Sequence, residues 1–312
     1  MGCGSWSSST WSSYKADHKI SASSTVEELY TAISIDKDLD PRGVTMRESC
    51  DSDEHPNSNA IILGLDVTGS MGHLAEEIAK GALNDLITQI YDNASLVDPQ
   101  VMIAGIGDAF YDRSPLQVSQ FESDIRIAEH LQKIWFEGGG GGNDGESYLL
   151  LYYFAARHTA IDCFLKRNQK GVIYTIGDEP CLDVITKSQI EDVFGDEVDS
   201  GISFDDIYNE ASKMYDIYHI CIEPSYGHGG SLIEGWRNKI GEKAIFIRRD
   251  ESDRIPHIIN TTLELKLGKK LDEIISKYDT STALTVSKAV GALARGSASL
   301  STTTSSDLLE FD

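Results

Sequence analysis

Between residues 60 and 267, short unbroken apolar runs alternate with longer segments in which apolar residues recur at helical spacing. The apolar runs are 60–65, 101–106, 171–176, 217–222 and 243–247, and residues such as Gly, Asp or Pro flank them. Apolar runs of this length are typical of strands that are buried on both faces, as in a parallel sheet.

The intervening segments predict helices. One apolar stripe recurs every four residues, at Leu74, Ile78, Ala82, Leu86 and Ile90. A second stripe falls within 127–134, and 148–156 is apolar nearly all round, as expected for a helix pressed against a sheet. Strands that alternate with helices in this way predict a doubly wound α/β domain with helices on both faces of the sheet.

One connection departs from the alternation of strand and helix. Residues 107–115 are rich in turn formers, and 116–121 alternates apolar with polar residues. Such a pattern indicates an antiparallel edge strand that is reached through a hairpin. The predicted fold is therefore a mostly parallel central sheet with one antiparallel edge strand, in a domain spanning 60–267.

The two flanks differ from this domain in composition. Residues 1–24 are rich in Ser, Gly and Thr and predict a disordered arm, although the aromatic residues Trp6, Trp11 and Tyr14 leave open a short packed segment. Residues 25–59 form an N-terminal extension with one helix expected at 25–33.

The C-terminal part, 268–312, predicts a helix at 269–278 and further helical spacing at 283–293. A Ser/Thr-rich stretch at 295–306 is expected to be disordered, and the chain closes with an acidic tail.

Charge and cysteine content restrict the classes of partner. The chain has 50 Asp and Glu against 27 Lys and Arg, a net charge of −23, which repels phosphate backbones and argues against a nucleic-acid partner. Its five cysteines are scattered without a CxxC pair, which favours a reducing compartment. Neither a signal sequence nor an apolar run of membrane-spanning length is recognisable, so we expect a cytoplasmic protein without a membrane partner.

Oxygen-bearing side chains gather where the predicted strands end. Asp66, Thr68 and Ser70 follow the first strand, Asp178 follows the strand at 171–176, and a glycine run at 138–142 precedes Asn143 and Asp144. In open α/β sheets, ligands bind beyond the carboxyl ends of the strands. Oxygen ligands without Cys or His favour Mg²⁺, Ca²⁺ or Mn²⁺.

These residues carry a family resemblance. The spacing of Asp66, Thr68 and Ser70 resembles the Asp-x-Ser/Thr-x-Ser signature of the metal-ion-dependent adhesion site (MIDAS) of von Willebrand factor A domains, and it stands between a strand and an amphipathic helix, as that family requires. Asp178 is similar to the later strand-end aspartate of the family, and the glycine run lies where the family has its second metal loop. The resemblance covers residues 60 to about 267.

The resemblance implies a role for each residue of the site. Thr68 and Ser70 would ligate Mg²⁺, or Mn²⁺ or Ca²⁺, directly, while Asp66 and Asp178 would act directly or through water. The threonine of the family's second loop is absent here, so Asn143 or Asp144 would take its place. Hydroxyl ligands leave the cation partly neutralised and open to an Asp or Glu of a partner. A direct Asp144 ligand would weaken that capture.

Other readings of single residues stay open. Asp66 and Ser70 could cap the following helix, although the agreement of three motifs favours metal ligation. Asp108 suits a turn cap as well as it suits the site, Glu146 fits the acidic start of a helix slightly better than a metal role, and Glu223 indicates a turn.

The leading functional hypothesis is a non-catalytic binding module whose metal captures a carboxylate of a partner protein. The resemblance implies an adaptor beside a AAA+ ATPase of the MoxR type as one candidate role. One alternative is a Mg²⁺-dependent phosphohydrolase with Asp66 as nucleophile, but Thr68 stands where such enzymes carry a second aspartate. Another is a structural subunit of a larger assembly, with a metal needed for folding.

Overall fold

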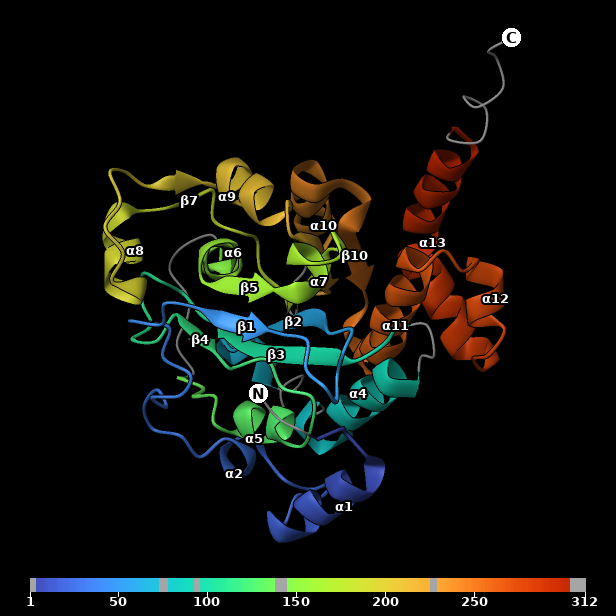
Figure 1. Cartoon of the computed structure of the whole chain (residues 1–312). Helices are drawn as coiled ribbons and strands as arrows, with labels where there is room; N and C mark the ends of the chain where they lie inside the picture. Colours follow the sequence, from blue (N-terminus) through green and yellow to red (C-terminus); the bar gives the residue numbers. More distant parts are fainter. Residues whose placement is uncertain (1–3, 73–77, 93–95, 138–144, 225–228, 304–312) are drawn as a thin grey trace.

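A six-stranded sheet forms the centre of the molecule (Figure 1). The computed structural model describes residues 4–72, 78–92, 96–137, 145–224 and 229–303. In spatial order the strands of the sheet are β4 (Leu116–Val118), β3 (Pro99–Ile106), β2 (Asn59–Asp66), β6 (Gly171–Gly177), β9 (Tyr215–Ile222) and β10 (Ala244–Ile247).

All neighbouring strands of this sheet run parallel except β3 and β4, which pair antiparallel. Counted along the chain, the spatial order is third, second, first, fourth, fifth and sixth, which is the order of a doubly wound sheet. The predicted fold class, including the antiparallel edge strand, is confirmed.

Both faces of the sheet are buried, which explains why its strands are mostly apolar, with few polar residues such as Thr175 of β6 and His219 of β9. Ile61, Leu63 and Leu65 of β2 belong to one core cluster, whereas Ala60 and Ile62 belong to the other. Because successive side chains of a strand point to opposite faces, each core takes alternate residues.

Helices cover the two faces separately (Figure 1). The face that contains Ile62 is covered by α6 (Tyr148–Arg157), α7 (Asp162–Leu165), α8 (Lys187–Phe194), α9 (Phe204–Ala211) and α10 (Gly229–Ile240). The opposite face is covered by α1 (Ser8–Asp17), α2 (Val26–Leu29), α4 (Leu83–Asp92), α5 (Arg126–Gln132), α11 (Ile255–Lys266), α12 (Leu271–Ile275) and α13 (Thr280–Thr303).

Short elements complete the chain. Two small sheets pair β1 (Arg47–Ser49) with β5 (Thr159–Ile161) and β7 (Val184–Ile185) with β8 (Ile202–Ser203). Short helical turns are η1 (Gly69–Met71), η2 (Ile78–Ala82), η3 (Gly241–Lys243) and η4 (Arg249–Arg254), and η2 is a π-helical turn that leads into α4.

The N-terminal arm differs from the sequence prediction, because it is helical and packed rather than disordered. Trp6, Trp11 and Tyr14 are buried in the core and stack on one another, with ring centroids 5.8 and 6.0 Å apart. The Tyr14 hydroxyl donates a hydrogen bond to Gln132 Oε1 of α5 at 2.5 Å. Burial of large aromatic rings outweighs the Ser/Gly-rich composition around them.

The C-terminal part also differs from its prediction. Helix α13 continues to Thr303 through most of the stretch expected to be disordered, and its residues Val286 and Val290 are buried in the core that α11 faces. The helix expected at 25–33 is the shorter α2. In the described part of the chain, no helix is both long enough and apolar enough to cross a membrane.

Candidate metal site

The candidate site lies where β2 and β6 end. These strands pair in parallel with Leu65 opposite Ile176, so that Asp66 and Gly177 lie side by side and Asp178 follows directly. Between the first and fourth strands of a doubly wound sheet the winding reverses, and ligands bind in the crevice outside the strand ends there. The predicted neighbourhood of Asp66 and Asp178 is therefore present.

Hydrogen bonds fix the Asp66 carboxylate on both oxygens. Oδ1 accepts from the backbone N–H of Thr68 at 2.9 Å and from the Thr68 hydroxyl at 2.6 Å. Oδ2 accepts from the Tyr148 hydroxyl at 2.9 Å. Asp66 thus organises its own loop through Thr68, and Thr68, not Asp66, is the N-cap residue of the following turn η1.

Tyr148 is a residue that the sequence analysis assigned only to an apolar helix. It is fully buried in α6, and its ring packs edge-on against His219 and Trp236. A Cβ added at Gly177 would lie 1.9 Å from the Tyr148 hydroxyl oxygen and 2.9 Å from Asp66 Oδ2. Only glycine at position 177 therefore leaves room for the bond between Tyr148 and Asp66.

Two further buried acids extend the site. Asp108 follows β3; its Oδ1 accepts from the Phe110 N–H at 2.8 Å, while its buried Oδ2 has no hydrogen-bond partner among the described residues. Asp108 is thus both a turn cap and a carboxylate with an unused oxygen.

Glu146 precedes α6, and its buried Oε2 likewise has no hydrogen-bond partner among the described residues. Its backbone N–H donates to Pro180 O at 2.8 Å, and its carbonyl accepts from the Leu182 N–H at 3.2 Å. These two bonds hold Glu146 against the loop that follows β6. The sequence analysis favoured a helix-start role for this acid, whereas the structure buries its carboxyl group near Asp66 and Asp108.

Burial dominates the electrostatics of these acids. It raises the pKa of the Asp66 carboxyl to about 7, against the opposing hydrogen bonds from Thr68, and the neighbouring Asp178 adds to the rise. Burial likewise raises the pKa of Glu146 to about 9, and the charges of Asp66 and Asp108 contribute. A divalent cation among these oxygens would offset their repulsion, so the donor set fits a hard cation that binds oxygen.

Asp178 carries an ion pair that the sequence analysis missed. Arg249 Nη2 of η4 lies 2.5 Å from Asp178 Oδ2, and Arg249 Nε donates to the carbonyl of Glu223 at 3.0 Å. Asp178 itself is 3% exposed, so this contact is largely shielded from water. The guanidinium group therefore offsets part of the negative charge that Asp178 brings to the site.

Three predicted ligands are described only in part or not at all. Ser70 lies in η1, two residues after Thr68, and its side chain is outside the described part of the structure. Asn143 and Asp144 lie outside the described residues. Within the described ranges, no three His, Cys, Asp or Glu side chains form a ready-made metal cluster.

The sequence matches no protein-family model and no curated protein sequence. Among solved structures, the pilus adhesin SpaC of Lactobacillus rhamnosus GG is similar at 14% identity and a TM-score of 0.42, over 68% of this chain and 31% of the adhesin. BatB of Bacteroides thetaiotaomicron is similar at 15% identity and a TM-score of 0.42, over 67% of this chain and 98% of BatB.

Proximal thread matrix protein 1 of the mussel byssus, in a structure with a zinc-occupied MIDAS motif, is similar at 9% identity and a TM-score of 0.42, over 69% of this chain and 49% of that protein. The chain thus spans less than half of the adhesin and of the byssus protein. The mixed α/β fold, with its mostly parallel six-stranded sheet, rests on the strand order described above.

Proposed function

We propose that this protein is a divalent-cation-dependent protein-binding module. The observation that carries the proposal is the position of Asp66 and Asp178 at the neighbouring ends of β2 and β6, at the reversal point of the sheet, with the Thr68 hydroxyl bonded to Asp66. Thr68 and Ser70 would supply hydroxyl oxygens to the cation, Asp66 and Asp178 would supply carboxylates, and Asn143 or Asp144 would complete the set.

The proposed cation is Mg²⁺, and Mn²⁺ or Ca²⁺ can use the same oxygen donors. Hydroxyl ligands are neutral, and Arg249 already offsets part of the charge on Asp178. With its pKa at about 9, Glu146 is protonated at neutral pH in the cation-free protein and adds no charge. A cation held in this way keeps positive charge with which it can attract one more carboxylate.

The partner we propose is a protein that offers an Asp or Glu side chain to the cation. Because this chain has a net charge of −23, the surface around that carboxylate should be basic. A AAA+ ATPase of the MoxR type, in the cytoplasm, is the candidate that the family resemblance suggests.

A pull-down with the immobilised full chain tests the proposal. We expect a discrete partner in the presence of Mg²⁺ that is lost with EDTA and with the double variant Asp66→Ala, Ser70→Ala. The matched control is Asp199→Ala, which removes an exposed acid far along the chain from the site residues. Capture that persists in EDTA, or that Asp199→Ala abolishes equally, would contradict the proposal.

A second candidate function is a structural subunit that needs the cation only for folding. Deep burial of Asp66, Asp108 and Glu146 favours it, since a cation would stabilise the folded state against their repulsion. In that case EDTA would unfold the chain without the loss of a discrete partner.

The hydrolase alternative has less support, because Thr68 stands where such enzymes carry the second aspartate that acts as acid and base. Release of phosphate from p-nitrophenyl phosphate in Mg²⁺, lost with Asp66→Asn, would favour the enzyme instead.

A further inference from the structure

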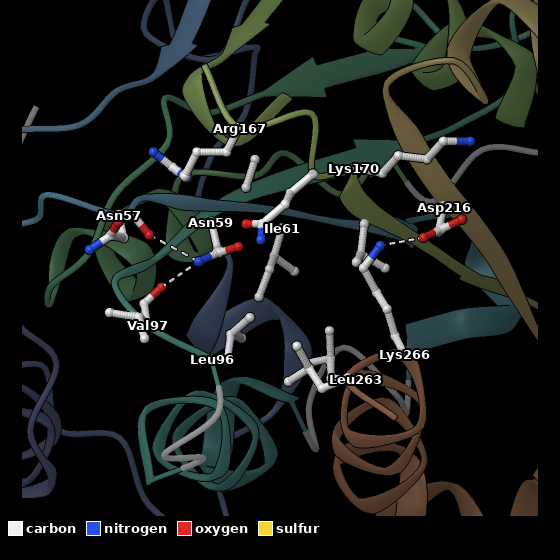
Figure 2. Close-up of a pocket in the computed structure, with 14 residues that line it drawn as sticks. Asn57, Asn59, Ile61, Leu96, Val97, Arg167, Lys170, Asp216, Leu263 and Lys266 are labelled. Atoms are coloured by element: carbon white, nitrogen blue, oxygen red, sulfur yellow. Dashed lines mark hydrogen bonds and ion pairs between the residues drawn. The ribbon is translucent and has the colours of Figure 1, made fainter. Parts of the chain in front are cut away.

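A cavity lies at the amino ends of the parallel strands, on the side of the sheet away from the candidate metal site (Figure 2). Its back wall is formed by the first residues of β2, β6 and β9, including Ile61, Val172 and Asp216. The last turn of α11 forms one side with Leu263 and Lys266. The site around Asp66 lies beyond the other ends of the same strands, so the two sites are separate.

The cavity has the size and lining of a small-molecule site. Its volume is about 550 Å³, within the range in which proteins bind small organic ligands. Apolar side chains line much of it, and Figure 2 shows Ile61, Leu96 and Leu263 grouped in its lower part. The Asn59 amide at the rim is fixed by hydrogen bonds from Nδ2 to Asn57 O at 2.9 Å and to Val97 O at 2.6 Å.

The charge of the lining is opposite in sign to that of the whole protein. Arg167, Lys170 and Lys266 line the cavity, and among its described lining residues Asp216 is the single acid, whereas acids outnumber bases in the chain by 50 to 27. Arg167 is balanced, because its Nη1 lies 2.7 Å from Asp51 Oδ2. The excess of positive over negative charge is therefore concentrated at the other end of the cavity, near Asp216.

Lysines outnumber carboxylates at that end. Lys266 and Lys243 both pair with Asp216, Lys243 at 3.4 Å. The Lys170 ammonium donates to the neutral carbonyl of Ser212 at 2.6 Å, and no carboxylate of the described residues lies within ion-pair distance of it. Figure 2 shows the exposed Lys170 side chain directed away from Ile61 and Leu263, so it has to turn toward the cavity to donate one of its three N–H groups to a ligand there.

We propose that this cavity binds a small organic anion with an apolar body, such as a medium-chain carboxylate. The acidic head would lie at the lysine-rich end beside Lys170 and Lys266. The apolar body would cover Ile61, Leu96 and Leu263. Such a ligand would contact both the lysines and the apolar residues of the lining. A free inorganic anion would contact only the lysines, and a neutral hydrocarbon would contact only the apolar residues.

The test is calorimetric titration of the full chain with octanoate, with octanamide and with acetate. Octanamide keeps the apolar body without the charge, and acetate keeps the charge without the body. We expect octanoate to bind and each of the other two to bind about tenfold more weakly or worse, because each lacks one half of the interaction. EDTA should leave octanoate binding unchanged, so this outcome does not depend on the proposed metal site.

Two variants locate the binding. Lys170→Glu reverses a charge on an exposed side chain and should weaken octanoate binding about tenfold. Val97→Trp enlarges a rim residue that is 48% exposed, so it can fill the cavity without disturbing the core. The matched control, Lys288→Glu on the exposed side of α13, should bind octanoate as the unchanged protein does.

Three results would overturn the proposal: no octanoate binding at millimolar concentration, octanamide binding as tightly as octanoate, or affinity that Lys170→Glu and Val97→Trp leave unchanged. An equal loss in Lys288→Glu would also overturn it, because that loss would report the overall charge of the chain. The unfolding temperature of each variant shows whether it is folded.

Discussion

The two ends of the strands in the central sheet carry charged groups of opposite sign. At the carboxyl ends of the strands, Asp66, Asp108 and Glu146 are buried, and burial raises the pKa values of Asp66 and Glu146. At the amino ends, Lys170 and Lys266 line one end of a cavity whose other lining residues include Ile61, Leu96 and Leu263. Parallel strands place all their equivalent ends on one side, so a single sheet separates the two chemistries by its whole length.

The comparison teaches that the burial of the charged groups, more than their number, decides which ligand we propose for each end of the strands. Buried carboxylates repel one another strongly and are satisfied by a compact cation that fits among them. Partly exposed lysines are screened by water and hold an anion weakly unless an apolar surface adds to the binding. The predictions below separate the two ends of the strands, from the largest effect to the smallest.

The largest expected effect is a pH-dependent stabilisation by Mg²⁺. Folding raises the pKa of Asp66 from its usual 3.8 to about 7, so the cation-free fold is favoured while this group is protonated and loses that stability as pH rises from about 4 through 7. A shift of this size corresponds to roughly 4 kcal/mol. Saturating Mg²⁺ should restore the loss at pH 8 and add little at pH 5, as measured by urea unfolding.

Asp66→Asn is the control for this titration, because it removes the carboxylate while it keeps the size of the side chain. It should remove the part of the pH dependence that comes from Asp66 and abolish the Mg²⁺ effect, whereas the loss of stability that the raised pKa of Glu146 causes up to about pH 9 should remain. An equal Mg²⁺ effect at both pH values would refute a site built on Asp66.

Substitutions of two glycines, one at each end of β6, compare the two ends of the strands next. Gly177→Ala would place a methyl group 1.9 Å from the Tyr148 hydroxyl, and Gly171→Ala would place one 2.9 Å from the Tyr215 ring. Both should destabilise the fold by roughly 1–3 kcal/mol through overpacking. Only Gly177→Ala should also weaken Mn²⁺ binding, measured by electron paramagnetic resonance.

Gly235→Ala controls for the substitution itself, because nothing lies within 4 Å of the added methyl group on α10. It should leave Mn²⁺ binding unchanged and keep or slightly raise stability. If Gly171→Ala weakened Mn²⁺ binding as much as Gly177→Ala, the two ends of the strands would not be independent.

Tyr148→Phe against Tyr152→Phe is a narrower comparison within α6. Both tyrosines are fully buried, but the Tyr148 hydroxyl bonds to Asp66 and the Tyr152 hydroxyl to Thr175 at 3.0 Å. Each variant should cost about 1–2 kcal/mol of stability from the lost hydrogen bond. Calorimetry should show a Mn²⁺ affinity about tenfold weaker for Tyr148→Phe alone, since only that hydroxyl orients a carboxylate of the site. Equal affinities would remove Tyr148 from the site.

Arg249→Gln should have the smallest effect and the opposite sign. It removes the guanidinium that pairs with Asp178, so the cation meets less positive charge beside the Asp178 carboxylate. Mg²⁺ affinity measured by calorimetry should rise about threefold to tenfold at low ionic strength. Weaker Mg²⁺ binding would mean that Arg249 positions Asp178 instead of competing with the cation.

Much of the fold could be predicted from the sequence because the strands of the central sheet are buried on both faces and are therefore rich in apolar residues. Strands that are buried on both faces are mostly apolar, and β2, β3, β6 and β9 stand out in the sequence for that reason. The neighbourhood of Asp66 and Asp178 follows from the rule for strand ends, which needs only the order of the elements.

The contacts that shape the site could not be predicted in the same way. Arg249 reaches Asp178 across 71 positions of the chain, and Tyr148 reaches Asp66 across 82. Periodicity describes neighbours within one element, so it marks Tyr148 only as an apolar helix residue. Composition misjudged the N-terminal arm for a related reason, because it averages over serines and glycines while three stacked aromatic rings determine the packing.

That packed arm has a practical consequence for how the chain can be divided. Trp6, Trp11 and Tyr14 pack on α4 and α5, which in turn cover the sheet, so a fragment trimmed to residues 60–267 would expose apolar surface on these two helices. Such a fragment should aggregate even though it keeps every proposed metal ligand. The smallest piece able to fold on its own is therefore larger than the piece that carries the chemistry.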